Sequence, residues 1–384
     1  MRAHRPRVGL YVHLPFCPHR CCYCDFAIAV IPPSSRRRND LVARYLRALQ
    51  REAETWQGQL LACTLYFGGG TPSFLRPEEL EPLLSFLRCA FALPPEAEVT
   101  LEANPGTVAA EDWRLWRELG INRLSLGVQA FQDEWLRWMR RGHTAAEAAA
   151  ACRAAQEAGF HNINLDLIYG LPGQTMEQWQ ATLRQAVALE PQHLSLYSLA
   201  VEPQTPLQRW IQRGRQAPPD DDLAADMYEW ALDFLGEAGY EPYELSNFAR
   251  PGFRSRHNCL YWRNEPYLGL GTSAASFLGG VRWSNAVPWR EYLRRMEAGL
   301  SPVAQEERLD REGQMRETLI LALRMREGIS EREFHRRFGM TLEALCGPTL
   351  ERLAEWGLLE RKGDAWRLTR RGMLLANVVF RELL

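Results

Sequence analysis

The stretch YVHLPFCPHRCCYC occupies residues 11–24 of a 384-residue chain and holds four of its nine cysteines. Cys17, Cys21 and Cys24 form a CxxxCxxC pattern directly after a short apolar run at 8–14. Three thiolates on one loop can bind three irons of a [4Fe–4S] cluster and leave the fourth iron open. An open metal position accepts a substrate or a cofactor. The pattern therefore predicts a cluster site at the end of the first strand.

The same loop leaves two alternatives open. A zinc ion could take the thiolates together with a fourth ligand such as His13 or His19. Cys22 also creates a second spacing, CxxxxCxC, in which it replaces Cys21. The kind of metal and the choice of second cysteine therefore depend on the surrounding sequence.

The remaining cysteines are scattered, and an odd total with such clustering does not resemble a disulfide framework. This usage favours a metal site in a reducing compartment, so we expect a cytoplasmic protein. Hydrophobic residues make up 46% and charged residues 24% of the chain, as in a globular protein with a real core. We find neither an apolar run long enough to span a membrane nor a secretory signal. The net charge of −1 predicts no nucleic-acid partner.

Short apolar runs alternate with amphipathic stretches along the first two thirds of the chain. The apolar runs lie at 8–14, 64–67, 98–102, 123–128, 163–168 and 194–199. The helical patterns lie at 38–56, 77–92, 109–119, 145–158, 175–188 and 222–238. This alternation predicts an α/β fold with a parallel sheet, either open and doubly wound or an incomplete TIM-type barrel. In both architectures ligands bind at the carboxyl ends of the strands.

Two segments interrupt the alternation. Residues 200–221 carry four prolines and lead into three consecutive aspartates at 220–222, which predicts a loop. Residues 246–290 are rich in Asn, Gly, Trp and Tyr and have little helical period, which predicts an irregular cap over the sheet edge.

The last part of the chain predicts a small α-rich domain. Helical patterns near 312–326, 331–338 and 342–356 precede a hairpin and a last helix at 369–384, the order of a winged helix. Residues 306–384 carry 15 basic and 14 acidic side chains, a balance that argues against a DNA footprint and favours packing or partner docking. The predicted domains are a partial barrel at 1–245, a cap or linker at 246–305 and a winged-helix-like domain at 306–384.

A second motif, YFGGGTP at 66–72, ends the second apolar run. Its three glycines let the backbone approach a ligand closely, and their N–H groups can meet a carboxylate. Alone, such a motif is usually a tight turn. It gains weight here because it shares a strand's carboxyl end with the cysteine loop.

CxxxCxxC after the first strand and GGGTP after the second resemble the radical S-adenosylmethionine (SAM) superfamily. The frame YVHLPFC at 11–17 is similar to relatives of oxygen-independent coproporphyrinogen III dehydrogenase. The resemblance implies a partial (β/α)6 barrel, a [4Fe–4S] cluster on Cys17, Cys21 and Cys24, and SAM at the open iron. The positions that correspond to the family's SAM contacts are Tyr11, Tyr23, Gly69, Gly70, Thr71, Glu102, Gln129, Arg141, Asp166 and Ala200.

Three features distinguish two branches of this family. The dehydrogenases have the pattern CxxxCxxCxC and a long N-terminal extension before it. In this sequence Phe26 occupies the position of the last cysteine of that pattern, and only 16 residues precede Cys17. Residues 257–262 read HNCLYW, which resembles the HNxxYW motif of the haem chaperone branch, the HemW family. The resemblance implies a chaperone that binds haem and delivers it to acceptor haemoproteins, respiratory and membrane-associated ones among them. A coproporphyrinogen III dehydrogenase or a radical SAM enzyme of another substrate is the alternative.

The HNxxYW motif also suits haem chemically. An imidazole can ligate haem iron, and Tyr and Trp can flank a porphyrin face, so His257, Tyr261 and Trp262 are the predicted haem residues. Cys259 inside the motif is an alternative soft ligand. The expected cofactors are therefore the [4Fe–4S] cluster, SAM and haem. No catalytic residue is assigned, and SAM cleavage and a homodimer stay open.

Overall fold

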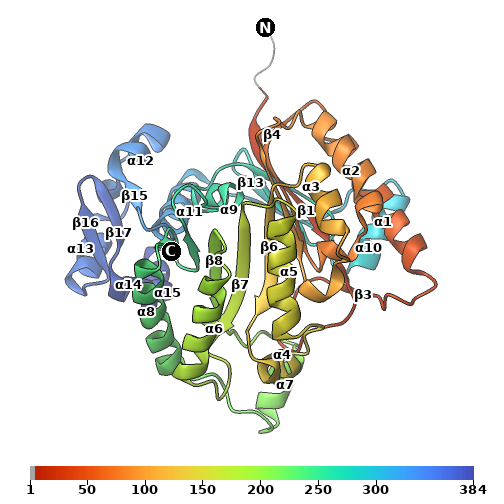
Figure 1. Ribbon diagram of the computed structural model, residues 1–384. Coiled ribbons are helices and arrows are strands. Elements are labelled where there is room, and N and C mark those ends of the chain that lie inside the picture. The colour runs from red at the N-terminus through yellow and green to blue at the C-terminus, as the bar shows by residue number, and fades with distance from the viewer. Residues whose placement is uncertain (1–4) are drawn as a thin grey trace.

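The computed structural model describes residues 5–384 and is built around one large sheet (Figure 1). Six neighbouring parallel strands form the centre of this sheet: β1 (Arg7–Leu14), β4 (Leu61–Gly69), β5 (Glu98–Ala103), β6 (Arg123–Gln129), β7 (Ile163–Tyr169) and β8 (His193–Ser198). Each lies at one of the predicted apolar runs. The α/β class and the incomplete TIM-type barrel are confirmed.

Helices cover the outer face of the six strands, as Figure 1 shows. They are α1 (Arg38–Glu54), α2 (Pro77–Ala90), α3 (Asp112–Glu118), α5 (Ala145–Glu157), α6 (Met176–Ala188) and α8 (Asp221–Glu237). All six coincide with predicted helical patterns. Several begin at side-chain caps; Thr144 and Thr175, for example, each accept a hydrogen bond from the third helical N–H and start α5 and α6.

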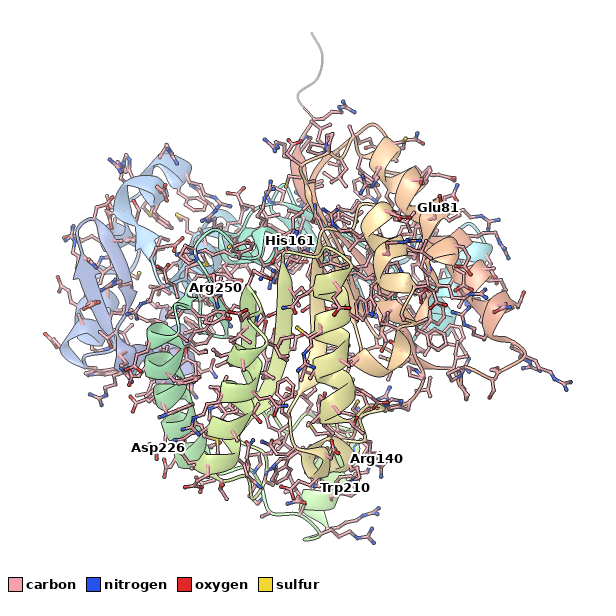
Figure 2. The ribbon with its side chains drawn as sticks, viewed as in Figure 1. Glu81, Arg140, His161, Trp210, Asp226 and Arg250 are labelled. Carbon is pink, nitrogen blue, oxygen red and sulfur yellow. The ribbon has the colours of Figure 1, made fainter. Side chains whose placement is uncertain are left out.

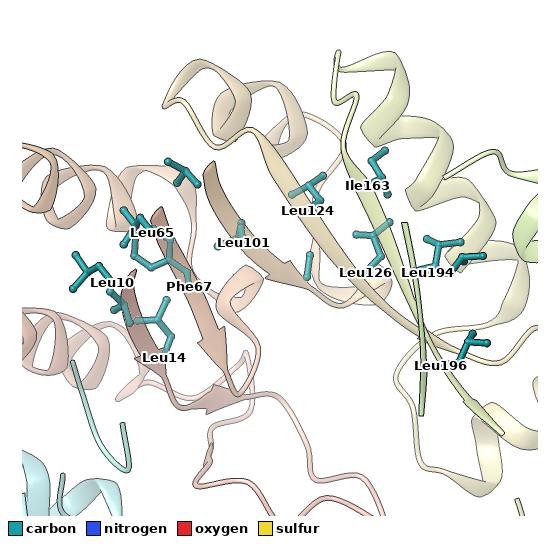
Figure 3. Close-up of a cluster of buried hydrophobic side chains, with 14 of the residues drawn as sticks. Leu10, Leu14, Leu65, Phe67, Leu101, Leu124, Leu126, Ile163, Leu194 and Leu196 are labelled. Atoms are coloured by element: carbon teal, nitrogen blue, oxygen red, sulfur yellow. The ribbon is translucent and has the colours of Figure 1, made fainter. Parts of the chain in front are cut away.

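The two faces of the sheet differ in polarity. Apolar side chains point outward into the layer beneath the helices, where Figure 3 shows Leu10, Leu65, Leu101, Leu124, Leu194 and their neighbours. The alternate positions are polar and include Thr64, Thr100, Ser125, Asn164, Asp166 and Ser195. A closed TIM barrel fills its interior with branched apolar side chains. Here the interior layer is polar, and it surrounds a cavity.

The sheet continues beyond both ends of the six-strand arc. β10 (Asn247–Ala249) and β9 (Glu241–Pro242) extend it next to β8. β11 (Tyr267–Leu270) runs parallel to β1 and is followed outward by β12 (Ala275–Leu278), β13 (Val281–Asn285) and β14 (Val303–Arg308). The helices α9 (Arg256–Trp262) and α10 (Trp289–Glu297) belong to the same stretch. The segment 246–290, predicted to be an irregular cap, thus contributes the four strands β10, β11, β12 and β13 to the sheet and also contains α9.

Short elements surround the cysteine loop. β2 (Phe16–Cys17) pairs with β3 (Ala29–Val30) across the loop. α4 (Asp133–Trp138) follows β6, and α7 (Pro206–Gln212) lies within the segment predicted to be a loop. Thr205 caps α7 by accepting the Gln208 N–H, so a helix of seven residues forms where the prolines suggested none.

The C-terminal part has the order of a winged helix, as predicted. Its elements are α11 (Arg311–Leu323), β15 (Ile329–Ser330), α12 (Glu331–Phe338), α13 (Leu342–Glu355), β16 (Leu359–Lys362) and β17 (Ala365–Leu368). The three strands form a small sheet in the order β15-β17-β16. The expected last helix is divided at Leu375 into α14 (Arg370–Leu374) and α15 (Ala376–Leu383). None of the helices in residues 5–384 has the length and apolarity needed to cross a membrane.

Candidate functional site

A cavity of about 370 Å³ opens inside the barrel at the carboxyl ends of the strands. Figure 1 shows this end beside α4 and α7. The cavity is lined by most of the residues that the sequence singled out: Cys17, Cys21, Tyr23, Cys24, Gly69, Gly70, Thr71, Glu102, Gln129, Arg141, Asp166 and Ala200. They come from the carboxyl ends of the six parallel strands and from the loops that follow them. The rule that ligands meet at strand ends therefore located the cavity correctly.

The cysteine loop presents three of its four thiols to the cavity. Cys17, Cys21 and Cys24 line it, and Cys17 Sγ lies 3.3 Å from Thr71 Oγ1. Cys22 is fully buried and does not line the cavity. Its backbone is bonded on both sides, since its N–H donates to Met139 O and its carbonyl accepts from the Leu207 N–H. This arrangement favours the CxxxCxxC spacing.

α4 and α7 support the loop from outside the barrel. Met139 directly follows α4 and Leu207 lies in α7, so the two bonds of Cys22 tie both helices to the loop. The Arg140 guanidinium lies 5.1 Å from the centre of the Trp210 ring, and both side chains are labelled at this end in Figure 2. The contact joins the turn after α4 to α7 by a cation–π interaction.

The GGGTP turn is shaped by the cysteine loop that packs against it. Gly69 has a φ of 113°, and a Cβ there would lie 2.5 Å from the His13 ring. A Cβ at Gly70 would lie 2.6 Å from the Pro15 carbonyl. These glycines are therefore required for the turn to pack beneath the loop, in addition to any contact with a ligand.

Glu102 is the carboxylate closest to the GGGTP turn. It accepts hydrogen bonds from the Tyr66 hydroxyl (2.8 Å) and the Gly69 N–H (3.1 Å). Burial, and to a lesser extent the charge of Asp166, raises the pKa of Glu102 to about 7. A ligand that brings hydroxyl or amino donors into the cavity would favour the ionised carboxylate.

Arg141 connects the cysteine loop to the ends of β5 and β6. It donates to the Gly127 carbonyl (2.7 Å) and to Asn104 Oδ1, and its Nη1 lies 3.5 Å from Cys21 Sγ. A Cβ at Gly127 would lie 3.0 Å from Arg141 Nη2, so only glycine leaves room for this guanidinium. The hydrogen bond of Cys21 to His19 and the charge of Arg141 outweigh burial and lower the pKa of the Cys21 thiol to about 7. The guanidinium thus favours a thiolate at this position.

Asp166 anchors a polar layer that the motifs did not reveal. Its carboxylate accepts from Ser125 Oγ (3.0 Å) and Asn164 Nδ2 (2.8 Å). Asn164 Oδ1 lies 2.6 Å from His193 Nδ1 and accepts from Ser195 Oγ at 3.1 Å. Sequence reasoning missed Ser125, Asn164 and Ser195 as cavity residues, although each sits at an inward position of a predicted strand.

Tyr11 is the exception among the predicted SAM residues, because it does not line the cavity. Its hydroxyl lies 3.1 Å from His13 Nδ1, and its ring stacks on Tyr66 with centroids 6.1 Å apart. It lies one layer deeper in the barrel than expected. Asn258, which lies within the HNxxYW motif, reaches the cavity instead.

The HNxxYW motif forms α9 and closes the opposite end of the barrel, where the strands begin. The Glu98 carboxylate, at the start of β5, accepts the N–H groups of Arg256 and His257, both at 2.9 Å. A Cβ at Gly9 would lie 2.8 Å from the Leu260 side chain, so β1 receives this helix only because it has a glycine there. α9 is the floor of the cavity rather than an open surface.

Among the predicted haem residues of the motif, His257 is fully buried, whereas Tyr261 and Trp262 are partly buried. His257 is 1% exposed; Nδ1 lies 2.8 Å from Thr64 Oγ1 and Nε2 lies 2.8 Å from the Tyr261 hydroxyl. Burial lowers the pKa of His257 to about 3, so the ring is neutral. Trp262 lies beneath the Arg324 guanidinium, 4.4 Å from it. Both ring nitrogens of His257 therefore have hydrogen-bond partners in this structure.

The donors at the cavity fit a cubane cluster and SAM. Within residues 5–384 no three His, Cys, Asp or Glu side chains converge as the ligands of one metal ion do. A cubane does not need such convergence, because each thiolate binds a different iron. The buried carboxylates of Glu102 and Asp166 line the cavity beside the thiols, as does the buried guanidinium of Arg141, whose Nε has no hydrogen-bond partner. These groups can bind a polar ligand. If bound here, a reduced cluster could supply an electron to SAM, and the residues around the cavity would orient and shield that ligand.

Comparison with known proteins agrees with this geometry. Residues 11–186 match the Radical SAM superfamily, and residues 309–375 match the HemN C-terminal domain. A protein named heme chaperone HemW from Bacillus subtilis is 37% identical over 96% of this chain and 97% of its own length. HemW from Escherichia coli is 34% identical, with 97% of each chain covered. The structure of coproporphyrinogen III oxidase (HemN) from E. coli superposes with a TM-score of 0.85 at 27% identity, covering 99% of this chain and 90% of that one.

The similarity to the HemW proteins is nearly full-length, and it includes the cysteine loop, the strand ends that line the cavity and the winged-helix part. The chain therefore belongs to the HemW family of the radical SAM superfamily.

Proposed function

We propose that this protein is a haem chaperone that carries a SAM-coordinating [4Fe–4S] cluster and delivers haem to acceptor haemoproteins. The observation that carries the proposal is the near full-length similarity to proteins named heme chaperone HemW, at 33–38% identity. The cluster is assigned to Cys17, Cys21 and Cys24, which line one cavity with the proposed SAM residues.

The mouth of the cavity supports a chaperone over a dehydrogenase. Phe26 lines the cavity and is 61% exposed, at the position where the dehydrogenase pattern carries a further cysteine. An exposed aromatic ring is suited to a flat apolar ligand such as a porphyrin face. Tyr197 and Ile28 line the same cavity, and Tyr197 is also exposed. We therefore place the haem surface at the mouth, beside the cluster, and not at His257.

The proposed setting is the cytoplasm. All nine cysteines are free in the structure, and such usage fits a reducing compartment. The proposed partners are haem and acceptor haemoproteins, including respiratory ones at the membrane. The winged-helix part, whose charges are balanced, is proposed to pack or dock rather than to bind nucleic acid.

One sample can test the proposal against its main alternative. The protein is reconstituted anaerobically with iron and sulfide, titrated with haem, and then assayed for oxidative decarboxylation of coproporphyrinogen III. We expect about one haem per chain and no porphyrinogen turnover. Turnover without haem binding would assign the protein to the dehydrogenases.

A matched pair of variants tests the place of haem. Phe26→Ala removes the exposed ring at the mouth and should weaken haem binding several-fold. Leu300→Ala removes a comparably accessible apolar side chain, 52% exposed, that does not line the cavity, and should leave haem affinity unchanged. Equal affinities for the two variants would reject the mouth as the haem surface.

A further inference from the structure

A chain of buried hydrogen bonds leads away from Asp166, one of the proposed SAM residues. Asn164 Nδ2 donates to the Asp166 carboxylate at 2.8 Å, and Ser195 Oγ lies 3.1 Å from Asn164 Oδ1. Ser195 Oγ also lies 2.6 Å from Asn247 Oδ1, and Asn247 Nδ2 donates to Glu244 Oε1. Only the first three members of the chain line the cavity. The chain therefore leads from the cavity, through β8 and β10, to the connection between β9 and β10.

The chain ends at the C-terminal part of the molecule. Glu244 is 1% exposed, and its Oε2 lies 3.9 Å from Nη2 of Arg324, the residue that ends α11. The backbones of the two segments are also joined, because the Arg326 N–H donates to the Tyr243 carbonyl at 2.9 Å. Figure 1 shows α11 between the barrel and the small C-terminal sheet. We call this contact between the β9–β10 connection and the end of α11 the junction.

The polar contact at the junction is incomplete. The atoms Glu244 Oε2, Arg324 Nε and Trp262 Nε1 are buried and have no hydrogen-bond partner among residues 5–384. A buried carboxylate oxygen and a buried guanidinium N–H each cost free energy when unpaired, and a short hydrogen bond between them would remove that cost. A movement of about 1 Å would bring the guanidinium of Arg324 within hydrogen-bond distance of Glu244. The junction is therefore sensitive to small displacements of the Glu244 carboxylate.

Ser195 is the member of the chain that can respond to a ligand. Its hydroxyl has one proton, and two acceptors lie within reach, Asn164 Oδ1 and Asn247 Oδ1. A ligand in the cavity that contacts Ser195 or Asp166 would favour one of these two directions. Donation to Asn247 fixes its amide group and, through that amide, the Glu244 carboxylate at the junction.

A second branch of hydrogen bonds leads to the same place. Burial lowers the pKa of His193, so its neutral ring donates from Nδ1 to Asn164 Oδ1 at 2.6 Å and accepts the Tyr243 hydroxyl at Nε2 at 2.9 Å. The Tyr243 hydroxyl in turn accepts the Ser255 N–H at 3.3 Å, at the start of α9. Both branches thus begin at Asn164 and end where the β9–β10 connection, α9 and the end of α11 pack together.

We propose that this network couples the cavity to the C-terminal part: a ligand bound at Asp166 closes the ion pair between Glu244 and Arg324 and thereby orders the junction. The inference rests on the proposed SAM site and is independent of where haem binds and of haem delivery. Coupling between two sites is reciprocal. A change at Arg324 must therefore alter SAM affinity, although Arg324 does not line the cavity.

The SAM affinity of the full-length, anaerobically reconstituted protein tests the coupling. Arg324→Ala should raise the dissociation constant of SAM about fivefold, because the ligand can no longer close the ion pair. Arg370→Ala is the matched control, since it removes an ion pair between the C-terminal part and the barrel, from α14 to Asp233 in α8, that lies outside the network. The control should leave SAM affinity unchanged. An unchanged affinity in Arg324→Ala, or an equal loss in both variants, would overturn the inference.

Hydrogen exchange provides a readout that a purely structural role would not change. In the unsubstituted protein, saturating SAM should slow amide exchange of the segment 318–328 at least threefold. Glu244→Gln keeps an acceptor for Asn247 Nδ2 but removes the charge that faces Arg324, so SAM should no longer slow exchange there. This variant also decides the question if Arg324→Ala does not fold. Equal slowing by SAM in Glu244→Gln and in the unsubstituted protein would overturn the inference.

Failure of the coupling can be distinguished from failure of the proposed function. If the unsubstituted protein does not bind SAM, the proposed SAM site is wrong, and the coupling is wrong with it. If SAM binds but Arg324→Ala and Glu244→Gln behave like the unsubstituted protein, only the coupling is wrong, and the chaperone function would stand.

Discussion

The two ends of the barrel carry the two most distinctive sequence patterns, and the fold treats them differently. At the end where the strands finish, the motif residues surround an open cavity beside the cysteine loop. At the end where the strands begin, α9 fills the interior, and its histidine is buried between Thr64, Tyr66 and Tyr261. Both patterns consist of residue types that bind cofactors. The comparison shows that residue types alone suggest which ligand could bind, whereas the position of the residues in the fold determines whether a ligand can reach them.

The largest expected effect concerns the cysteine end. Replacing Cys17, Cys21 or Cys24 with Ser should abolish the [4Fe–4S] cluster, measured as iron and sulfide per chain and as visible absorption. Cys22→Ser should retain the cluster, because Cys22 does not line the cavity. The opposite pattern, with Cys22 needed and Cys21 dispensable, would mean that the other cysteine spacing applies.

The next effect concerns the floor. His257→Ala should lower the free energy of unfolding by about 2–4 kcal/mol, because it leaves two buried hydroxyls without partners and opens a void. The measurement is chemical denaturation of the cluster-free protein. The haem absorption spectrum of the variant should match that of the unsubstituted protein. If His257→Ala changes the haem spectrum but not the free energy of unfolding, then the end of the barrel where the strands begin also binds a ligand.

A smaller effect is expected for Glu102 and Asp166, which line the cavity and are proposed to contact SAM but not iron. Glu102→Ala and Asp166→Ala should each raise the dissociation constant of SAM about tenfold, or about 1.4 kcal/mol, while iron content stays constant. Equilibrium dialysis under anaerobic conditions measures the change. If both variants bind SAM with unchanged affinity, these carboxylates only support the fold.

The smallest effect is a pH dependence that belongs to one end only. The pKa of Glu102 is raised to about 7 by burial in the ligand-free protein, so its contribution to stability is full below about pH 4.5 and is lost as the pH rises towards 7. Glu102→Gln should reduce the loss of stability between pH 5.5 and 7.5 by on the order of 1 kcal/mol. His257 has a pKa near 3 and stays neutral over this range. The free energy of unfolding is measured at both pH values for both proteins. An equal change with pH in the two proteins would show that Glu102 does not titrate in this range.

The sequence predicted the six central strands and their helices because each strand is an apolar run and each helix an amphipathic one. The strand-end rule then gathered residues as distant as Cys17 and Ala200 into one cavity. α9 escaped detection because it is one of the shortest helices and is enclosed by other elements, so it has no clear apolar stripe. β14 escaped because VAQEER at 303–308 is an exposed, polar edge strand.

Depth within the barrel was also beyond sequence reasoning. Tyr11 and Glu102 both occupy inward positions, yet only Glu102 reaches the cavity, because β1 places Tyr11 beside His13 and behind Gly68. Likewise, the polar layer of Ser125, Asn164 and Ser195 carries no motif. Its members become recognisable only when neighbouring strands are aligned.

Haem transfer tests the account most directly. Cluster-loaded protein carrying one haem per chain is mixed with an excess of an apo-haemoprotein, and the Soret absorption is followed as haem moves to the acceptor. The account predicts complete transfer, faster with the cluster present than after its removal. Haem that stays on the protein, together with turnover of coproporphyrinogen III by the same sample, would contradict it.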